Sequence, residues 1–250
     1  MAAPCSTKTV YDEQFFAYTS SLSNKSAQVI VPILRKLLPG VASVVDFGCA
    51  QGVWLKHWMD NGIDDIQGVD GDYIDLSKLA IPGGKFYAQD LNEPIDLGRH
   101  FDLAYSLEVA EHLHPENSER FIESLTCHAD IVLFSAAPPG QGGESHINER
   151  SFDSWRALFY ARGYAAYDCV RPSIANLNEV SFWYRYNVML YVHNDFEATL
   201  PKNIRATKVD DGQPIADISP PLFKLRKFII RLLPYGLQNL LARGKAVVQD

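Results

Sequence analysis

Four side chains in two separate stretches have the types and spacing for metal or acid–base chemistry. Glu108, Glu111 and His112 are three and four residues apart, so one helical turn would place them on the same side. His146 lies far along the chain, in the glycine-rich stretch 140–148. Two carboxylates and two imidazoles are a suitable set of mixed oxygen and nitrogen ligands for a divalent metal such as Mg²⁺ or Mn²⁺.

Two other interpretations of these residues stay open. His146 can act without a metal, as a general base that removes a proton from the reacting group. Alternatively, the histidines are packed or solvent-facing residues, and Glu108 only hydrogen-bonds a bound ligand. His114 adjoins Pro115, which indicates a helix boundary, so we leave His114 out of the candidate set.

The elements that must position these residues are strands alternating with helices. Apolar runs predict strands at 42–47, 63–70, 85–90, 101–106, 131–135, 164–170 and 182–192. Helical spacing predicts helices at 26–38, 51–61, 73–79, 118–128 and 151–162, and Pro32 must start or kink the first of them. This alternation predicts a mostly parallel sheet covered on both faces, closed by the last two strands as an antiparallel, hairpin-like addition.

A glycine turn follows the first predicted strand. The apolar run ends at Asp46-Phe47-Gly48 and passes directly into an amphipathic segment, which is how an open α/β sheet presents backbone N–H groups to a ligand. Gly48 and Gly52 have no Cβ, so the chain can turn tightly and a ligand can approach the backbone there.

Polar residues end the next three predicted strands. Asp70 follows Gly48 by 22 residues, where an acid can accept both hydroxyls of a ribose, and Asp90 can accept from an adenine amino group. Ser106 ends the fourth strand. In a doubly wound sheet all of these ends border one pocket. The Gly-x-Gly-x-x-Gly pattern of a pyrophosphate clamp is absent, which disfavours a nicotinamide-dependent reductase.

Composition bounds the class of protein. The chain has 250 residues, 47% of them hydrophobic, which is enough for one sizeable α/β domain. Four scattered cysteines, the lack of a signal-like start and the lack of a bilayer-length apolar run predict a reduced, cytoplasmic protein. A net charge of −7 argues against a general nucleic-acid binder, so no nucleic-acid partner is expected.

Over about 42–192 these features resemble the class I S-adenosylmethionine (SAM)-dependent methyltransferases. The motifs occur in that family's order: Asp46 to Gly52, Gly68-Val69-Asp70, Gln89-Asp90-Leu91 and 101–106. The resemblance implies a Rossmann-like, seven-stranded sheet with an antiparallel last strand. It also implies SAM as the cofactor, contacted by Asp46, Gly48, Cys49, Gly52, Asp70, Asp90, Leu91 and Ser106. Ala50 departs from the family's usual glycine, and a positive φ there would be strained.

The Glu-x-x-Glu-His segment and the later His resemble the metal site of small-RNA 3′-terminal 2′-O-methyltransferases. Residues 108–112 also resemble ubiquinone-pathway O-methyltransferases. The resemblance implies catalytic roles for Glu111, His112 and His146, and a metal held by these three together with Glu108. Such a metal would hold two neighbouring hydroxyls and lower the pKa of the one attacked, which favours O-methylation of a diol, catechol or sugar.

The stretches 11–16, 26–33, 138–148 and 183–187 resemble bacterial methyltransferases that modify surface polysaccharides and other sugars. This implies an O-methyltransferase whose partner is a sugar or a similar small polyol. A catechol- or quinone-type O-methyltransferase and a non-catalytic scaffold with the same fold remain alternatives. Trp183, Tyr184 and Tyr186 either stack on the sugar or belong to the core.

The predicted organisation has four parts, of which the last is distinct in charge. An N-terminal arm and helix (1–40) precede the SAM-binding domain (41–193), a linker or lid (194–220) and basic amphipathic helices (221–250). Residues 221–245 carry a formal charge of +6 and no acid, while the rest carries −13. The tail therefore either contacts a partner protein or the inner membrane face, or packs on its own acidic domain. The oligomeric state is not predicted.

Overall fold

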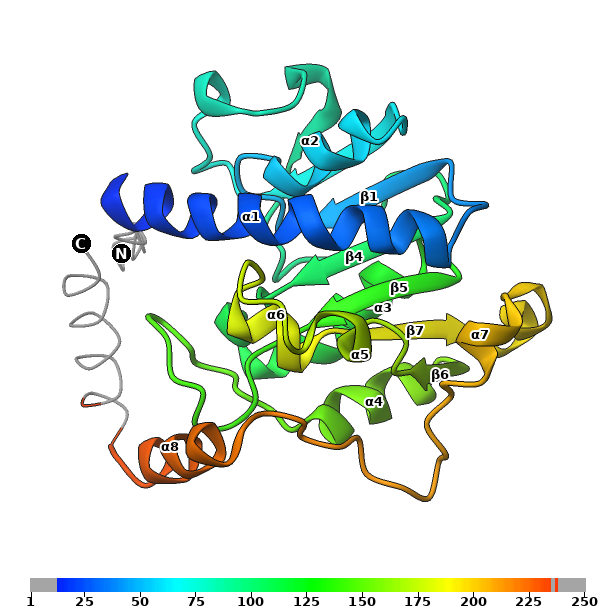
Figure 1. The fold of residues 1–250 in the computed structure, drawn as a ribbon. Coiled ribbons are helices and arrows are strands. Elements are labelled where there is room, and N and C mark those ends of the chain that lie inside the picture. Colours follow the sequence, from blue (N-terminus) through cyan, green and yellow to red (C-terminus); the bar gives the residue numbers. More distant parts are fainter. Residues whose placement is uncertain (1–12, 235–236, 238–250) are drawn as a thin grey trace.

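Seven strands form one sheet in the computed structural model of the chain, which describes the backbone of residues 13–234 and 237 and side chains from residue 21 onward (Figure 1). Their order across the sheet is β3-β2-β1-β4-β5-β7-β6. In chain order they are β1 (Ser43–Phe47), β2 (Asp65–Asp70), β3 (Phe86–Ala88), β4 (Leu103–Leu107), β5 (Ile131–Ser135), β6 (Tyr164–Tyr167) and β7 (Met189–His193).

All neighbouring strands are parallel except β7, which is antiparallel to both β5 and β6. The predicted mostly parallel sheet with an antiparallel last strand is therefore confirmed. The strand order reverses between β1 and β4, so their carboxyl ends flank the crevice where doubly wound sheets bind ligands.

Alternate residues of the central strand point to opposite faces of the sheet. Val44 joins one apolar core with helices α1 (Glu13–Leu37) and α2 (Val53–Asp60). Val45 joins the other core with α3 (Ser118–Thr126) and α4 (Phe152–Tyr160). Helices therefore cover both faces, as period-two burial along a parallel strand requires.

Two predicted helices differ from the structure. The helix expected from residue 26 already begins at Glu13 and continues through Pro32, so it does not start at the proline. The helix expected at 73–79 is only a 3₁₀ turn, Leu76–Lys78. Residues 11 and 12 of the stretch 11–16, and residues 235–236 and 238–250 of the predicted tail helices, lie outside the described part of the chain.

The strand predicted at 182–192 is wrong in its first half. Phe182–Asn187 forms a short helix, α6, and β7 begins at Met189. The aromatic run favours a strand locally. The helix instead places Tyr184 edge-on against Trp54 of α2, with ring centroids 5.2 Å apart, and buries Asn187. A further helix, α5 (Arg171–Ile174), also separates β6 from β7, so the pair is antiparallel but not a hairpin.

The segment 194–220 runs along the outer edge of β6. It contains the short helix α7 (Lys202–Arg205), and its side chains Leu200, Ile204 and Ile215 are buried. The backbone N–H of Val209 donates to the Ala166 carbonyl at 2.9 Å, as a further strand would. The segment leads into helix α8 (Pro221–Arg231).

Arg171 joins three distant parts of the chain inside the protein. Its fully buried guanidinium binds both carboxylate oxygens of Asp168, at 2.8 and 2.7 Å. It also donates to the carbonyls of Tyr186 at 3.1 Å and Ala216 at 2.9 Å. Both α6 and the segment before α8 are therefore held by one side chain.

Replacing this side chain should destabilise the fold strongly. Arg171→Met leaves Asp168 and two carbonyls without their cation, so we expect the free energy of unfolding, measured in urea, to fall by about 3–5 kcal/mol. The matched control is Arg99→Met, which breaks an exposed pair with Asp65 and should cost about 1 kcal/mol or less. Equal losses in the two variants would contradict the role assigned to Arg171.

Candidate functional site

The turn after β1 has a left-handed backbone at three positions. The φ angles of Gly48, Ala50 and Gly52 are 91°, 46° and 77°. A Cβ on Gly48 would lie 2.4 Å from a methyl carbon of Val109, so this position excludes any side chain. The turn therefore brings the backbone against the segment that follows β4.

Ala50 does adopt the positive φ that its side chain disfavours. A left-handed conformation costs a residue with a Cβ about 1–2 kcal/mol. The Ala50 N–H donates to the Asp70 carboxylate at 2.7 Å, and this hydrogen bond to a charged acceptor offsets the strain. The turn after β1 is thus tied to the end of β2.

Three of the predicted cofactor residues lie together at this turn. Asp70 is buried, and its other oxygen accepts from the Gly71 N–H at 2.7 Å and the Tyr73 hydroxyl at 2.5 Å. Burial raises the pKa of Asp70, although these donors lower it. Burial, followed by the charge of Asp70, raises the pKa of Asp46, and burial raises the pKa of the Cys49 thiol. The turn is therefore rich in carboxyl groups and holds its thiol protonated.

The remaining predicted cofactor residues occupy the ends of β3 and β4. Asp90 is exposed, and its Oδ1 accepts from the backbone and side chain of Asn92. Leu91 is buried in the core on the α3 side. Ser106 is fully buried, and its hydroxyl has no hydrogen-bond partner among the described residues.

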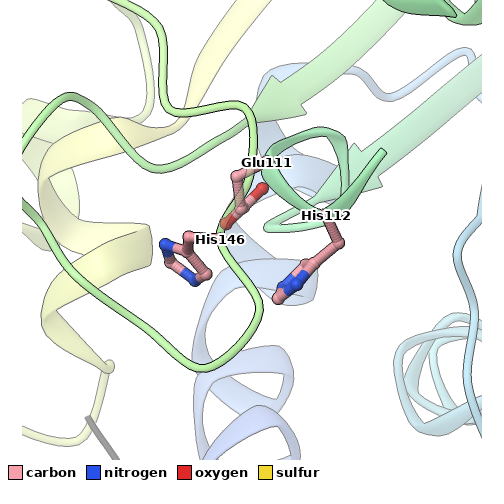
Figure 2. A group of neighbouring side chains, drawn as sticks. All are labelled: Glu111, His112 and His146. Atoms are coloured by element: carbon pink, nitrogen blue, oxygen red, sulfur yellow. The ribbon is translucent and has the colours of Figure 1, made fainter. Parts of the chain in front are cut away.

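A second group of side chains converges beyond β4 and β5 (Figure 2). Glu111 and His112 lie on a 3₁₀ turn, Ala110–His112, after β4, and His146 lies in the loop after β5. One ligand-type atom from each lies within 4.8 Å of the other two. The structure thus brings together all three residues that we predict to be catalytic.

Glu111 is a fully buried acid with few hydrogen-bond donors. Its carboxylate oxygens make no hydrogen bond of good geometry among the residues that the structure describes, and only the backbone N–H groups of Glu111 and Ala137 lie near enough to lower its pKa. Burial and the charge of Glu108 raise the pKa of Glu111 well above its usual value. A buried carboxyl group with a strongly raised pKa in a cluster of titratable groups is a candidate for contact with a ligand.

The two imidazoles of the group meet edge to face. Their ring centroids are 4.9 Å apart, with an angle of 89° between the ring planes. Burial, followed by the charge of His146, lowers the pKa of His112 to about 3. His112 is therefore uncharged at neutral pH, and an uncharged imidazole has a nitrogen lone pair for a proton or a metal ion.

Glu149 organises the loop that carries His146, and our sequence analysis missed it. Its Oε1 lies 2.9 Å from Nδ1 of His146, which leaves Nε2 of the ring for other contacts. The same carboxylate accepts from the backbone N–H groups of Gly140 at 2.7 Å and Gly142 at 2.8 Å. Two features of the sequence could have pointed to Glu149. It follows His146 by three residues, and it lies in a glycine-rich loop whose backbone N–H groups need hydrogen-bond acceptors.

Glu108 lies beside this group but outside it. Its φ of 58° is left-handed, so it is not on the helical turn with Glu111 that its spacing predicts. Its carboxylate accepts from the side-chain amides of Gln141 at 2.8 Å and Asn187 at 3.1 Å. Burial raises the pKa of Glu108, and these two hydrogen bonds lower it. Sequence reasoning named neither amide as a site residue.

Comparison with known proteins identifies one family. The sequence profile described as "Methyltransferase domain" matches residues 18–169. No curated protein matches the chain.

Several solved structures share the fold at low identity. DesVI of Streptomyces venezuelae has a TM-score of 0.54 at 14% identity, over 72% of this chain and 95% of its own. The sugar N-methyltransferase KedS8 from a Streptoalloteichus species has a TM-score of 0.54 at 16% identity, over 77% and 98%. The methyltransferase domain of bacterial CtHen1-C has a TM-score of 0.51 at 19% identity, over 69% and 98%.

The strain at Ala50 can be tested by removing its Cβ. Ala50→Gly removes about 1–2 kcal/mol of backbone strain from the folded state, but glycine loses about 0.5–1 kcal/mol more conformational entropy on folding. We therefore expect the free energy of unfolding to rise by about 0.5–1 kcal/mol. The matched control is Ala157→Gly on the exposed side of α4, which should lose about 0.5–1 kcal/mol. A loss of similar size at both positions, measured by urea unfolding, would contradict this explanation.

Proposed function

Because this chain belongs to the methyltransferase domain family, we propose that it transfers a methyl group from SAM to a hydroxyl of a sugar or similar polyol. It is a SAM-dependent methyltransferase by family and by fold. The proposal concerns the acceptor, the oxygen nucleophile and the residues that handle its proton.

One observation carries the proposal. The cluster of Glu111, His112 and His146 follows β4 and β5, and the glycine turn follows β1, at the same carboxyl edge of the sheet. A cofactor bound across the turn therefore lies beside groups that can orient an acceptor. Methyl transfer from a sulfonium is an in-line displacement, so its rate depends mainly on holding donor and acceptor in line.

The cluster suits a hydroxyl acceptor because a hydroxyl must lose its proton as it is methylated. His146 is the proposed proton acceptor, and Glu149 fixes its ring through Nδ1. In other enzymes too, a carboxylate holds one nitrogen of an imidazole in place so that the other nitrogen can act as the base.

A polyol acceptor is supported by the polar groups that line the cluster. The Glu108 carboxylate and the buried amides of Gln141 and Asn187 form a hydrogen-bonded triangle, in which Asn187 donates to Gln141 at 2.8 Å. Such groups can exchange hydrogen bonds with sugar hydroxyls. KedS8 is described as a sugar N-methyltransferase, which supports a sugar acceptor but leaves nitrogen as the competing nucleophile.

As the alternative to His146 acting as the base, we propose that Glu111, His112 and His146 hold a divalent metal ion, in which case the free ring nitrogen of His146 binds the ion and does not accept the proton. These residues fit an ion because their ligand-type atoms lie within 4.8 Å of one another, the Glu111 carboxylate is buried without a hydrogen bond of good geometry, and His112 is held uncharged. Two imidazoles with one carboxylate favour Mn²⁺, Fe²⁺ or Zn²⁺ over Mg²⁺, which prefers oxygen ligands. When bound, such an ion would supply Lewis acidity that lowers the pKa of an acceptor hydroxyl.

Two substitutions separate cofactor binding from chemistry. His146→Ala should reduce methyl transfer to a sugar panel by about 100-fold or more and leave SAM affinity within about twofold, because the base is lost and the cofactor turn is intact. Asp70→Asn should weaken SAM binding, measured by calorimetry, because the ribose acceptor loses its charge. The matched control, His114→Ala, alters an exposed histidine outside the cluster and should change neither. Full turnover in His146→Ala would overturn the role assigned to His146. If the parent protein binds no SAM, the enzyme proposal fails and the non-catalytic scaffold is favoured.

The metal proposal has its own test. Manganese binding to the chelator-treated protein, followed by electron paramagnetic resonance, should saturate at one ion and disappear in Glu111→Gln and in His112→Ala. Chelation should also abolish turnover, and added Mn²⁺ should restore it. Turnover that survives chelation, with no manganese bound, would remove the metal and leave His146 acting alone.

A further inference from the structure

Helix α8 sits on the loop of the candidate site by its polar side. The Lys227 ammonium lies 2.5 Å from an Asp217 carboxylate oxygen, and an Arg226 guanidinium nitrogen donates to the Gln141 carbonyl at 3.0 Å. A Cβ on Gly140 would lie 2.1 Å from the Lys227 carbonyl oxygen, so the helix backbone approaches the loop closely. The side of α8 that faces the protein therefore carries Arg226 and Lys227, together with Phe223, which packs on Phe182 of α6 with ring centroids 4.7 Å apart.

The opposite side of α8 is apolar and exposed. Five large side chains there are 51–81% exposed; they are Leu222, Leu225, Phe228, Ile229 and Leu232. At 100° per residue they span about 120° of the helix, the width of a face that normally packs on a core. We call this stripe the α8 apolar face. A contiguous exposed stripe of this kind indicates a binding surface.

We propose that the α8 apolar face docks on the surface of an anionic lipid bilayer. The exposed cations Lys224 and Arg231 border the stripe, at the place where basic side chains extend to acidic headgroups. Residues 221–234 carry four cations and no acid, and of these Lys224 and Arg231 are exposed, so an anionic surface would attract this helix.

Charge also argues against a second copy of the chain as the occupant. A twofold-symmetric contact through this stripe would bring the cations of each copy next to those of the other. None of the helices in the described part of the chain combines the length and hydropathy needed to cross a membrane. The expected mode is therefore an 11-residue helix lying in the headgroup region.

Docking has a consequence for the candidate site, and this consequence rests on the proposed function. Because Gly140 and Gln141 of the site's loop lie directly against α8, the bound protein would hold the loop beside the lipid surface (Figure 1). An acceptor sugar attached to a membrane lipid would then lie on the same side of the protein as this loop. Docking itself does not depend on turnover, so the two ideas can fail separately.

Vesicle co-sedimentation of the full chain tests the proposal. We expect binding to vesicles of phosphatidylcholine with phosphatidylglycerol, weaker binding in high salt, and little binding to phosphatidylcholine alone. The double variant Leu225→Ser/Phe228→Ser should weaken binding by about tenfold or more, and Lys224→Gln/Arg231→Gln should weaken it on the anionic vesicles only. The matched control, Leu76→Ser, removes a side chain that is 61% exposed elsewhere and should bind as the parent does.

Three results would overturn the proposal. The first is no binding to anionic vesicles, and the second is equal binding to both compositions. The third is a concentration-dependent dimer, detected by light scattering, that Leu225→Ser/Phe228→Ser dissolves. SAM affinity and urea unfolding show whether each variant is folded. Loss of vesicle binding by a folded Leu225→Ser/Phe228→Ser variant therefore reports on the α8 apolar face.

Discussion

The rest of the structure depends on carboxyl groups buried at the carboxyl edge of one sheet. Each must be neutralised by a donor or a proton, and the chain supplies donors by bending its backbone. The left-handed Ala50 gives its N–H to Asp70, and the glycines of the loop after β5 give theirs to Glu149. Glu111 makes no hydrogen bond of good geometry among the described residues, and burial raises its pKa well above the usual value, so the proposed site centres on it.

Side chains from more distant parts of the chain hold this edge of the sheet in place. The antiparallel β7 lies between β5 and β6, and α6, which precedes β7 in the chain, places Asn187 against the Glu108 carboxylate. Arg171 fixes the carbonyl of Tyr186 next to that asparagine. The same guanidinium holds the segment that leads to α8, so the site and the α8 apolar face share one buried anchor.

Much of the fold could be predicted because it depends on local patterns. The β-branched run at β1 and the acid that ends β2 follow from periodicity and spacing alone. The left-handed φ of Glu108 and the helix at Phe182–Asn187 could not be predicted, because tertiary contacts override local preference there. Glu149 was missed because two of its three partners are backbone N–H groups, which a sequence does not display, and only its spacing from His146 pointed to it.

The most direct test of the central claim is a crystal structure of the protein with S-adenosylhomocysteine. The account predicts that the ribose hydroxyls contact the Asp70 carboxylate at the turn after β1. It also predicts that the sulfur faces the space bounded by Glu111, His112 and His146. A nucleoside bound away from Asp70, or a sulfur turned away from the three side chains, would contradict it.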